Sequence, residues 1–401
     1  MRLPFSVVGV TRCLSCRVRA PPDQPRRQPM SDYVSLNRVH THTSRKREVM
    51  AGIALLVSIA GFVLQTETLG VVGELGYAKP MLVMYITHSC EMLLLPTQIL
   101  VLWLRVWISR RETLASFYAK HTGHLRATAV AVARRNRPDM SARRYCVYTA
   151  AVLAVAVNLA GASWYVAVNM TTTADLTAIY NCSTFFAYAF SVWLLHERVH
   201  TLKVVSVLLS VLGVFVVAYL GSGASDASAS GRRRVWGNVI IAAGTVLYGL
   251  YEVLYKKIAC PPQTVSAKKQ AAFANAVGTA IGVGTVVLMW PLLIVLHFGG
   301  WETFAVPSAR VAGFLALSIV GNVAFFGSFL VLMSLTSPVL GSVSSLLATC
   351  AVPVVNYAVW REKITVAEVI GGLLIVGAFV LLLRASADDF VEEDSPADDG
   401  V

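Results

Sequence analysis

A few ionisable and polar side chains interrupt the long apolar segments of this 401-residue chain, and these residues could do chemistry. His88 and Glu91 lie three residues apart in one segment, and Tyr248, Tyr251 and Glu252 lie together in another. A charge inside a bilayer is costly, so such residues usually face a cavity, a partner or the interior of a helix bundle. The spacing therefore predicts two polar clusters inside an otherwise apolar protein.

On a helix, His88 and Glu91 share one face. An imidazole and a carboxylate side by side can bind a cationic substrate or relay a proton. The alternative is a hydrogen-bonded pair that only joins two packed helices.

Glu252 is framed by tyrosines, with Tyr248, Glu252 and Tyr255 along one helical stripe. A carboxylate among aromatic rings suits an amine or an aromatic cation. Lys256 follows four residues later, so an ion pair within one helix is the competing interpretation.

Uncharged polar groups at membrane depth extend the candidate binding set. Asn158, Tyr180, Asn181 and Asn322 would hydrogen-bond a polar solute, or would join neighbouring helices. Asp175 begins the segment that holds Tyr180 and is expected to be its N-cap.

The elements that must position these residues are membrane helices. The chain is 56% hydrophobic and 14% charged, with a mean hydropathy of +0.63. Many apolar runs reach the roughly 18 residues that indicate a transmembrane helix. The sequence predicts an all-α polytopic membrane protein with ten helices, near 49–69, 81–103, 145–168, 172–195, 201–220, 235–257, 270–297, 310–333, 338–360 and 364–384.

The net charge of +12 could suggest nucleic acid, but the positions of the basic residues favour membrane topology. The segment 104–144 holds ten arginines and lysines and two acids, as positive-inside loops do. We therefore expect a basic cytoplasmic loop, both termini in the cytoplasm and no nucleic-acid partner. The run Arg232–Arg234 falls on the opposite side and violates the pattern.

A pair of helices joined through a glutamate occurs twice. Glu197 matches Glu362, with further matches of Thr201 to Thr365, Gly213 to Gly377 and Phe215 to Phe379. Five helices per half would invert the second half relative to the first, which suits alternating access. Glu197 and Glu362 would then lock equivalent hairpins on opposite membrane faces.

This duplication divides the chain into five parts. The halves are 49–220 and 235–384, joined by the linker 221–234. The remaining segments, 1–48 and 385–401, are expected to be a disordered cytoplasmic tail and an acidic disordered tail. Met30 is a second plausible start.

The pattern resembles the drug/metabolite transporter superfamily, with two EamA-type halves over about 49–384. Residues 175–190 (DLTAIYNCSTFFAYAF), 247–258 (LYGLYEVLYKKI) and 334–357 look like the F branch of solute carrier family 35. The resemblance implies a transporter, and some members of that branch have been proposed to carry thiamine.

We therefore expect a secondary transporter of a small polar organic metabolite that is cationic or neutral, with thiamine-like solutes among the candidates. The alternatives are an antiporter of nucleotide sugars or other anions, an intramembrane enzyme, and a non-transporting receptor or scaffold. A binding site for nucleotide sugars or other anions would need a buried cation. The HExxH and GxSxG motifs that would indicate an enzyme are missing. We expect no catalytic residues and no cofactor. We also expect no metal site, because Cys13 and Cys16 form a single CxxC without a second pair of ligands.

The expected partners are the lipid bilayer and the substrate. Proton coupling and a homodimer are left open. An endomembrane location, Golgi or vacuole, is favoured over the plasma membrane.

Overall fold

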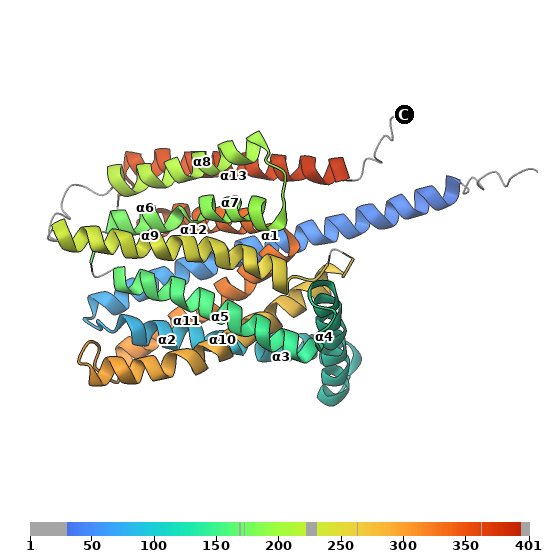
Figure 1. Ribbon diagram of the computed structural model, residues 1–401, viewed down its shortest axis with the longest axis horizontal. Coiled ribbons are helices and arrows are strands. Elements are labelled where there is room, and N and C mark those ends of the chain that lie inside the picture. Colours follow the sequence, from blue (N-terminus) through green and yellow to red (C-terminus); the bar gives the residue numbers. More distant parts are fainter. Residues whose placement is uncertain are drawn as a thin grey trace, which may run out of the picture. The chain divides into compact units, whose positions relative to one another are not determined.

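The computed structural model describes residues 30–167, 170–171, 173–221, 231–262, 264–361 and 363–393. Two compact units divide the chain, residues 1–45 and 46–401. Every polar cluster discussed below belongs to the second unit. All regular elements of the described residues are helical (Figure 1).

The helices follow one another along the chain in this order: α1 (Met30–Glu74), α2 (Pro80–Ser89), η1 (Cys90–Leu93), α3 (Leu94–Arg110), α4 (Leu114–Asn136), α5 (Ala142–Ala167), α6 (Thr173–Asn181), α7 (Ser183–Leu195), α8 (Thr201–Val216), η2 (Val217–Gly221), α9 (Gly231–Leu254), η3 (Tyr255–Ala259), α10 (Ala267–Phe298), α11 (Ala309–Leu335), α12 (Pro338–Trp360) and α13 (Val366–Glu393).

Ten helical stretches of the described chain are long and apolar enough to cross a membrane, which confirms the polytopic all-α prediction. Two of them contain a break, at Cys90–Leu93 and at Cys182. The helices also extend past the expected apolar limits. In particular, α1 begins at Met30, ahead of 49, and α13 ends at Glu393, beyond 384.

A close crossing holds α8 against α13. A Cβ atom added to Gly213 would lie 2.8 Å from the Gly371 carbonyl oxygen, and one added to Gly371 would lie 2.6 Å from the Gly213 carbonyl oxygen. The backbones therefore touch, which only glycine permits. Figure 1 shows the two helices side by side and running in opposite directions. Gly377, the repeat match of Gly213, has open space around it.

The loop before α2 is fastened by the loop between α10 and α11. Both carboxylate oxygens of Glu302 accept hydrogen bonds from α2, one from the Met81 amide at 3.0 Å and one from the Leu82 amide at 2.8 Å. Tyr77 donates to the Ala305 carbonyl at 2.7 Å. A carboxylate at a helix N-terminus satisfies amides that have no partner within the helix.

Buried side chains from most of the helices form the core. Its largest fully buried side chains include Tyr251, Phe329 and Leu346.

Candidate functional site

The pair at the end of α2 forms as the spacing predicts. His88 Nδ1 lies 2.8 Å from Glu91 Oε1, and the Glu91 side chain is fully buried. From α11, Asn322 Nδ2 donates to the Thr87 carbonyl at 3.0 Å and lies 3.5 Å from Glu91 Oε1. Within the described part of the chain, Glu91 Oε2 has no hydrogen-bond partner. One carboxylate oxygen is thus engaged, and the other is left to receive a donor.

A break in the second membrane span presents Glu91. The residues Cys90–Leu93 form a 3₁₀ turn between α2 and α3, and Pro96 follows in the first turn of α3, where proline is tolerated. The Leu95 amide donates to the Thr279 hydroxyl at 2.8 Å. On α10, Gly282 allows the turn to approach, because an added Cβ would lie 2.4 Å from the Met92 nitrogen.

The second carboxylate, Glu252, is also fully buried. The Ser342 hydroxyl of α12 donates to its Oε2 atom, while Oε1 and the Tyr251 hydroxyl have no hydrogen-bond partner among the described residues. The alternative ion pair with Lys256 is wrong. The Lys256 ammonium instead donates to the carbonyls at the end of α11, among them Thr336 O at 2.5 Å.

A row of three aromatic rings lies beside Glu252. The ring of Tyr180 lies 5.4 Å from that of Tyr248, which lies 5.9 Å from that of Tyr251. Tyr251 is the chain neighbour of Glu252, and both side chains are fully buried. The structure therefore brings the three tyrosines together beside Glu252, although they come from two membrane spans.

The side-chain amides of two predicted site residues donate hydrogen bonds to atoms of the helices themselves. Asn158 donates to the Ala154 carbonyl at 2.7 Å and to the Thr285 hydroxyl at 2.9 Å. Asn181 donates to Thr177 O of its own helix at 2.8 Å. The Asn158 Oδ1 atom has no partner in the described chain, so a polar solute could still donate to it.

Sequence reasoning missed a third carboxylate inside a span, Glu67 of α1. With its amide turned so that the nitrogen faces the carboxylate, Asn356 donates to both Glu67 oxygens, at 2.9 and 3.0 Å. The signal was present, because Glu67 lies within the apolar stretch 49–69.

Asp175 lies in a cluster of hydrogen-bonded polar side chains at one end of the bundle, and its expected role as an N-cap is wrong. It lies inside the first turn of α6, which begins at Thr173, and so it is not the N-cap. Arg234 donates to both of its oxygens, at 2.6 and 3.0 Å, and Tyr219 and Asn238 donate at 2.7 and 3.0 Å. One arginine of the 232–234 run, which violates the charge pattern, thus has a structural role.

The hairpin glutamates are only partly described. Glu197 Oε2 lies 3.7 Å from the Lys203 ammonium, so its cation is a lysine of the following helix. Glu362 lies outside the described residues. Among the described His, Cys, Asp and Glu side chains, no group of three could hold a metal ion.

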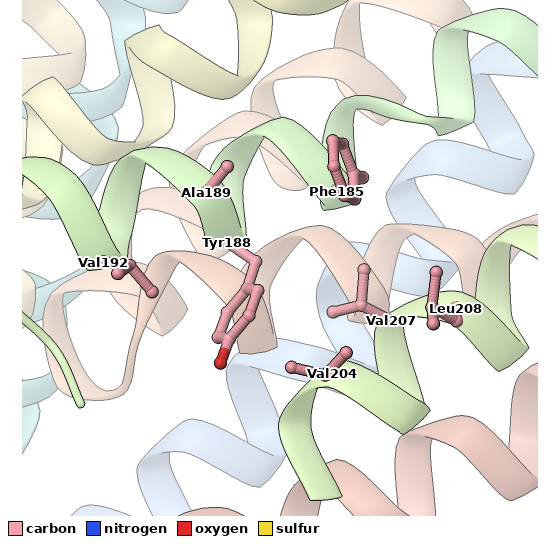
Figure 2. A pocket seen from close by; sticks show the side chains of 7 residues that line it. All are labelled: Phe185, Tyr188, Ala189, Val192, Val204, Val207 and Leu208. Atoms are coloured by element: carbon pink, nitrogen blue, oxygen red, sulfur yellow. The ribbon is translucent and has the colours of Figure 1, made fainter. Parts of the chain in front are cut away.

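A separate apolar pocket of about 370 Å³ opens between α7 and α8. Figure 2 shows Tyr188 pointing into the gap between the helices. Phe185 and Leu208 at this pocket are exposed, whereas Val207 is buried. Neither carboxylate lines it, so it is distinct from the polar site.

Comparisons with known proteins point to transporters. Residues 125–219 match the model of the EamA-like transporter family. An uncharacterized transporter of Schizosaccharomyces pombe is 27% identical over 53% of this chain and 61% of its own. A thiamine-repressible mitochondrial transport protein of Saccharomyces cerevisiae is 27% identical over 58% and 60%. An uncharacterized vacuolar membrane protein of the same yeast is 26% identical over 57% and 58%.

The matched region spans about three fifths of the length of each of these relatives. A solved crystal structure, described only as that of a protein, superposes with a TM-score of 0.56 at 15% identity, over 86% of this chain and 98% of that one. That likeness concerns the fold alone. The resemblance to the drug/metabolite transporter superfamily is confirmed, while the F branch of solute carrier family 35 stays a prediction.

Proposed function

From its place in the drug/metabolite transporter superfamily, we propose that this chain is a secondary transporter of a small polar organic metabolite, cationic or neutral. The observation that carries the proposal is the pair of fully buried carboxylates, Glu91 and Glu252. Each has one engaged oxygen and one free oxygen among the described residues, and the rings of Tyr248 and Tyr251 lie beside Glu252. A buried acceptor without a donor is unfavourable, so a substrate with N–H or O–H groups would stabilise the site.

The charge of the site favours a cation over an anion. The nearest lysine in this span, Lys256 of η3, is held by carbonyls at the end of α11. Tyr180, Tyr248 and Tyr251 add ring faces that attract an amine or a planar aromatic cation. Nucleotide sugars and other anions remain the competing substrates, and they would need a cation that these residues do not supply.

We propose alternating access between two inverted halves as the mechanism. The opposite directions of α8 and α13, the last helices of the two expected halves, support it. So do the contacts across the halves at the site, from Asn322 to Glu91 and from Asn158 to Thr285. The His88–Glu91 pair would carry a proton if transport is proton-coupled.

Uptake by purified full-length protein in liposomes tests the function. The panel contains labelled amines, thiamine (because one relative is named as thiamine-repressible) and a nucleotide sugar. Glu252→Gln and Glu91→Gln keep the shape of the side chain and remove its charge, so we expect cation uptake to be lost while folding persists. Glu74→Gln changes an exposed carboxylate at the end of α1 and serves as the control.

Three outcomes decide the proposal. Uptake of a cation that only the two buried variants lose supports it. Uptake of an anion, or normal uptake by both variants, refutes the assignment of the site. Binding of a metabolite without any movement across the bilayer refutes transport and favours a receptor.

The location is also a proposal. Relatives named as mitochondrial and vacuolar favour an internal membrane, and the basic 104–144 segment favours cytoplasmic termini. Fluorescent tagging at the C-terminus, with protease protection, tests both.

A further inference from the structure

The basic segment 104–144 is largely a helix, although the sequence suggested a loop. Thr113 caps α4, because its hydroxyl accepts from the Ser116 amide. Figure 1 shows α4 lying across the directions of the membrane spans, and it contacts α3, α5 and α10. An element in this orientation lies in the plane of the membrane rather than through it.

The second half of α4 is fixed to the bundle. Val132 and Ala133 are buried against Tyr145 and Phe273. Arg135 donates to the carbonyls of Lys257 and Cys260, at 3.1 and 3.0 Å. The height of the helix relative to the ends of the spans is therefore set by the fold.

The first half of α4 has an apolar face that the bundle leaves uncovered. Leu114 lies about five turns before Val132 and hence on the same face. Yet Leu114 is 48% exposed and Tyr118 is 53% exposed. Beside them, at the end of α3, Arg111 stacks on the Trp107 ring at 5.0 Å. Tryptophan with adjacent arginine is typical of the membrane–water interface.

The charge of the segment is one-sided. All ten of its arginine and lysine side chains are exposed. One of its two acids, Glu112, is paired with Lys120 at 2.7 Å. Arg126 and Arg134, on the face away from Val132, make no hydrogen bond or ion pair with another described residue. The net positive charge is therefore available to an external anion.

We propose that α4 is an interfacial helix that binds anionic phospholipid headgroups of the leaflet on its side. Its uncovered apolar face enters the acyl region, and its long basic side chains extend from there to the lipid phosphates. The fixed second half holds the helix at the headgroup level, so the lipid would order the first half. This binding is independent of substrate transport.

The test titrates full-length protein in detergent with phosphatidylserine or phosphatidylcholine and counts bound lipid by native mass spectrometry. The wild type should prefer phosphatidylserine. Each basic residue near an anionic surface contributes about fivefold in affinity, so Arg126→Gln with Arg134→Gln should weaken phosphatidylserine binding by roughly 25-fold. Binding of phosphatidylcholine should not change.

The matched control is Arg233→Gln with Arg310→Gln, which removes two exposed charges near the starts of α9 and α11. It should retain phosphatidylserine binding, because η3, at the opposite end of α9, is the part that contacts α4. Equal binding by the α4 variant and the wild type overturns the proposal. Equal weakening in both double variants also overturns it, because net charge alone would then explain the effect. Melting temperatures confirm that both variants are folded.

Discussion

Replacement of Gly282 by alanine should disturb the site without touching any polar group. The added Cβ would lie 2.4 Å from the Met92 nitrogen and 2.8 Å from the Glu91 carbonyl carbon. Both are backbone atoms, which cannot rotate away as a flexible side chain can. The 3₁₀ turn would have to move by about 1 Å to restore ordinary contact, and such overpacking costs about 1–3 kcal/mol.

The same movement should reach the substrate. Glu91 lies on the displaced turn and is positioned by His88 and Asn322. Impairing one hydrogen bond to a charged group costs about 1.5–3 kcal/mol. The apparent affinity in liposome uptake should therefore fall by roughly tenfold or more. We also expect a lower melting temperature of the purified protein.

Gly313→Ala is the matched control, because an added Cβ on this α11 glycine meets nothing within 4 Å. If Gly282→Ala matches it in both melting temperature and uptake affinity, the turn is not held by α10 and the reasoning is refuted. If stability falls and affinity does not, Glu91 lies outside the binding site.

Three further changes test the packing and the caps. Gly371→Ala should destabilise the protein by about 1–3 kcal/mol, whereas Gly372→Ala, whose added Cβ meets only a sulfur at 3.9 Å, should not; equal melting temperatures would contradict the α8–α13 crossing. Asp175→Asn and Arg234→Gln should be non-additive, with the double variant no less stable than the weaker single variant, and additive melting shifts would contradict their pairing. Glu302→Ala should cost about 0.5–2 kcal/mol as the loss of an N-cap does, and an unchanged thermal melt would show that the α2 amides find other partners.

The membrane spans could be predicted because length and apolarity are local properties. All ten predicted segments correspond to helices of the described chain. The ends of the helices could not be predicted, because a helix continues past its apolar segment wherever its backbone hydrogen bonds are satisfied. The clearest case is α4, whose polar residues suggested a loop, although Leu125, Ala129, Val132 and Ala133 along its second half pack on the bundle.

The site was half predictable for the same reason. The His88–Glu91 contact depends on helical spacing alone. Partners such as Asn322, 231 residues from Glu91, and Ser342, 90 residues from Glu252, depend on the packing of distant spans. For Lys256 the helical spacing suggested the wrong partner. The spacing offered Glu252, whereas the Lys256 ammonium donates to the carbonyls at the end of α11.

The two carboxylates are held in different ways, and this difference bears on coupling. Glu252 and its partner Ser342 both belong to the second expected half, so their bond can persist while the halves move. Glu91 belongs to the first half, whereas Asn322, which lies 3.5 Å from its engaged oxygen, and Gly282, which supports its turn, belong to the second. If the halves move as proposed, the contacts of Glu91 with Asn322 and of its turn with Gly282 would change, whereas the Glu252–Ser342 bond could persist. A substrate bound at Glu91 would then favour one arrangement of the halves over the other, which is how binding would be coupled to a change of conformation.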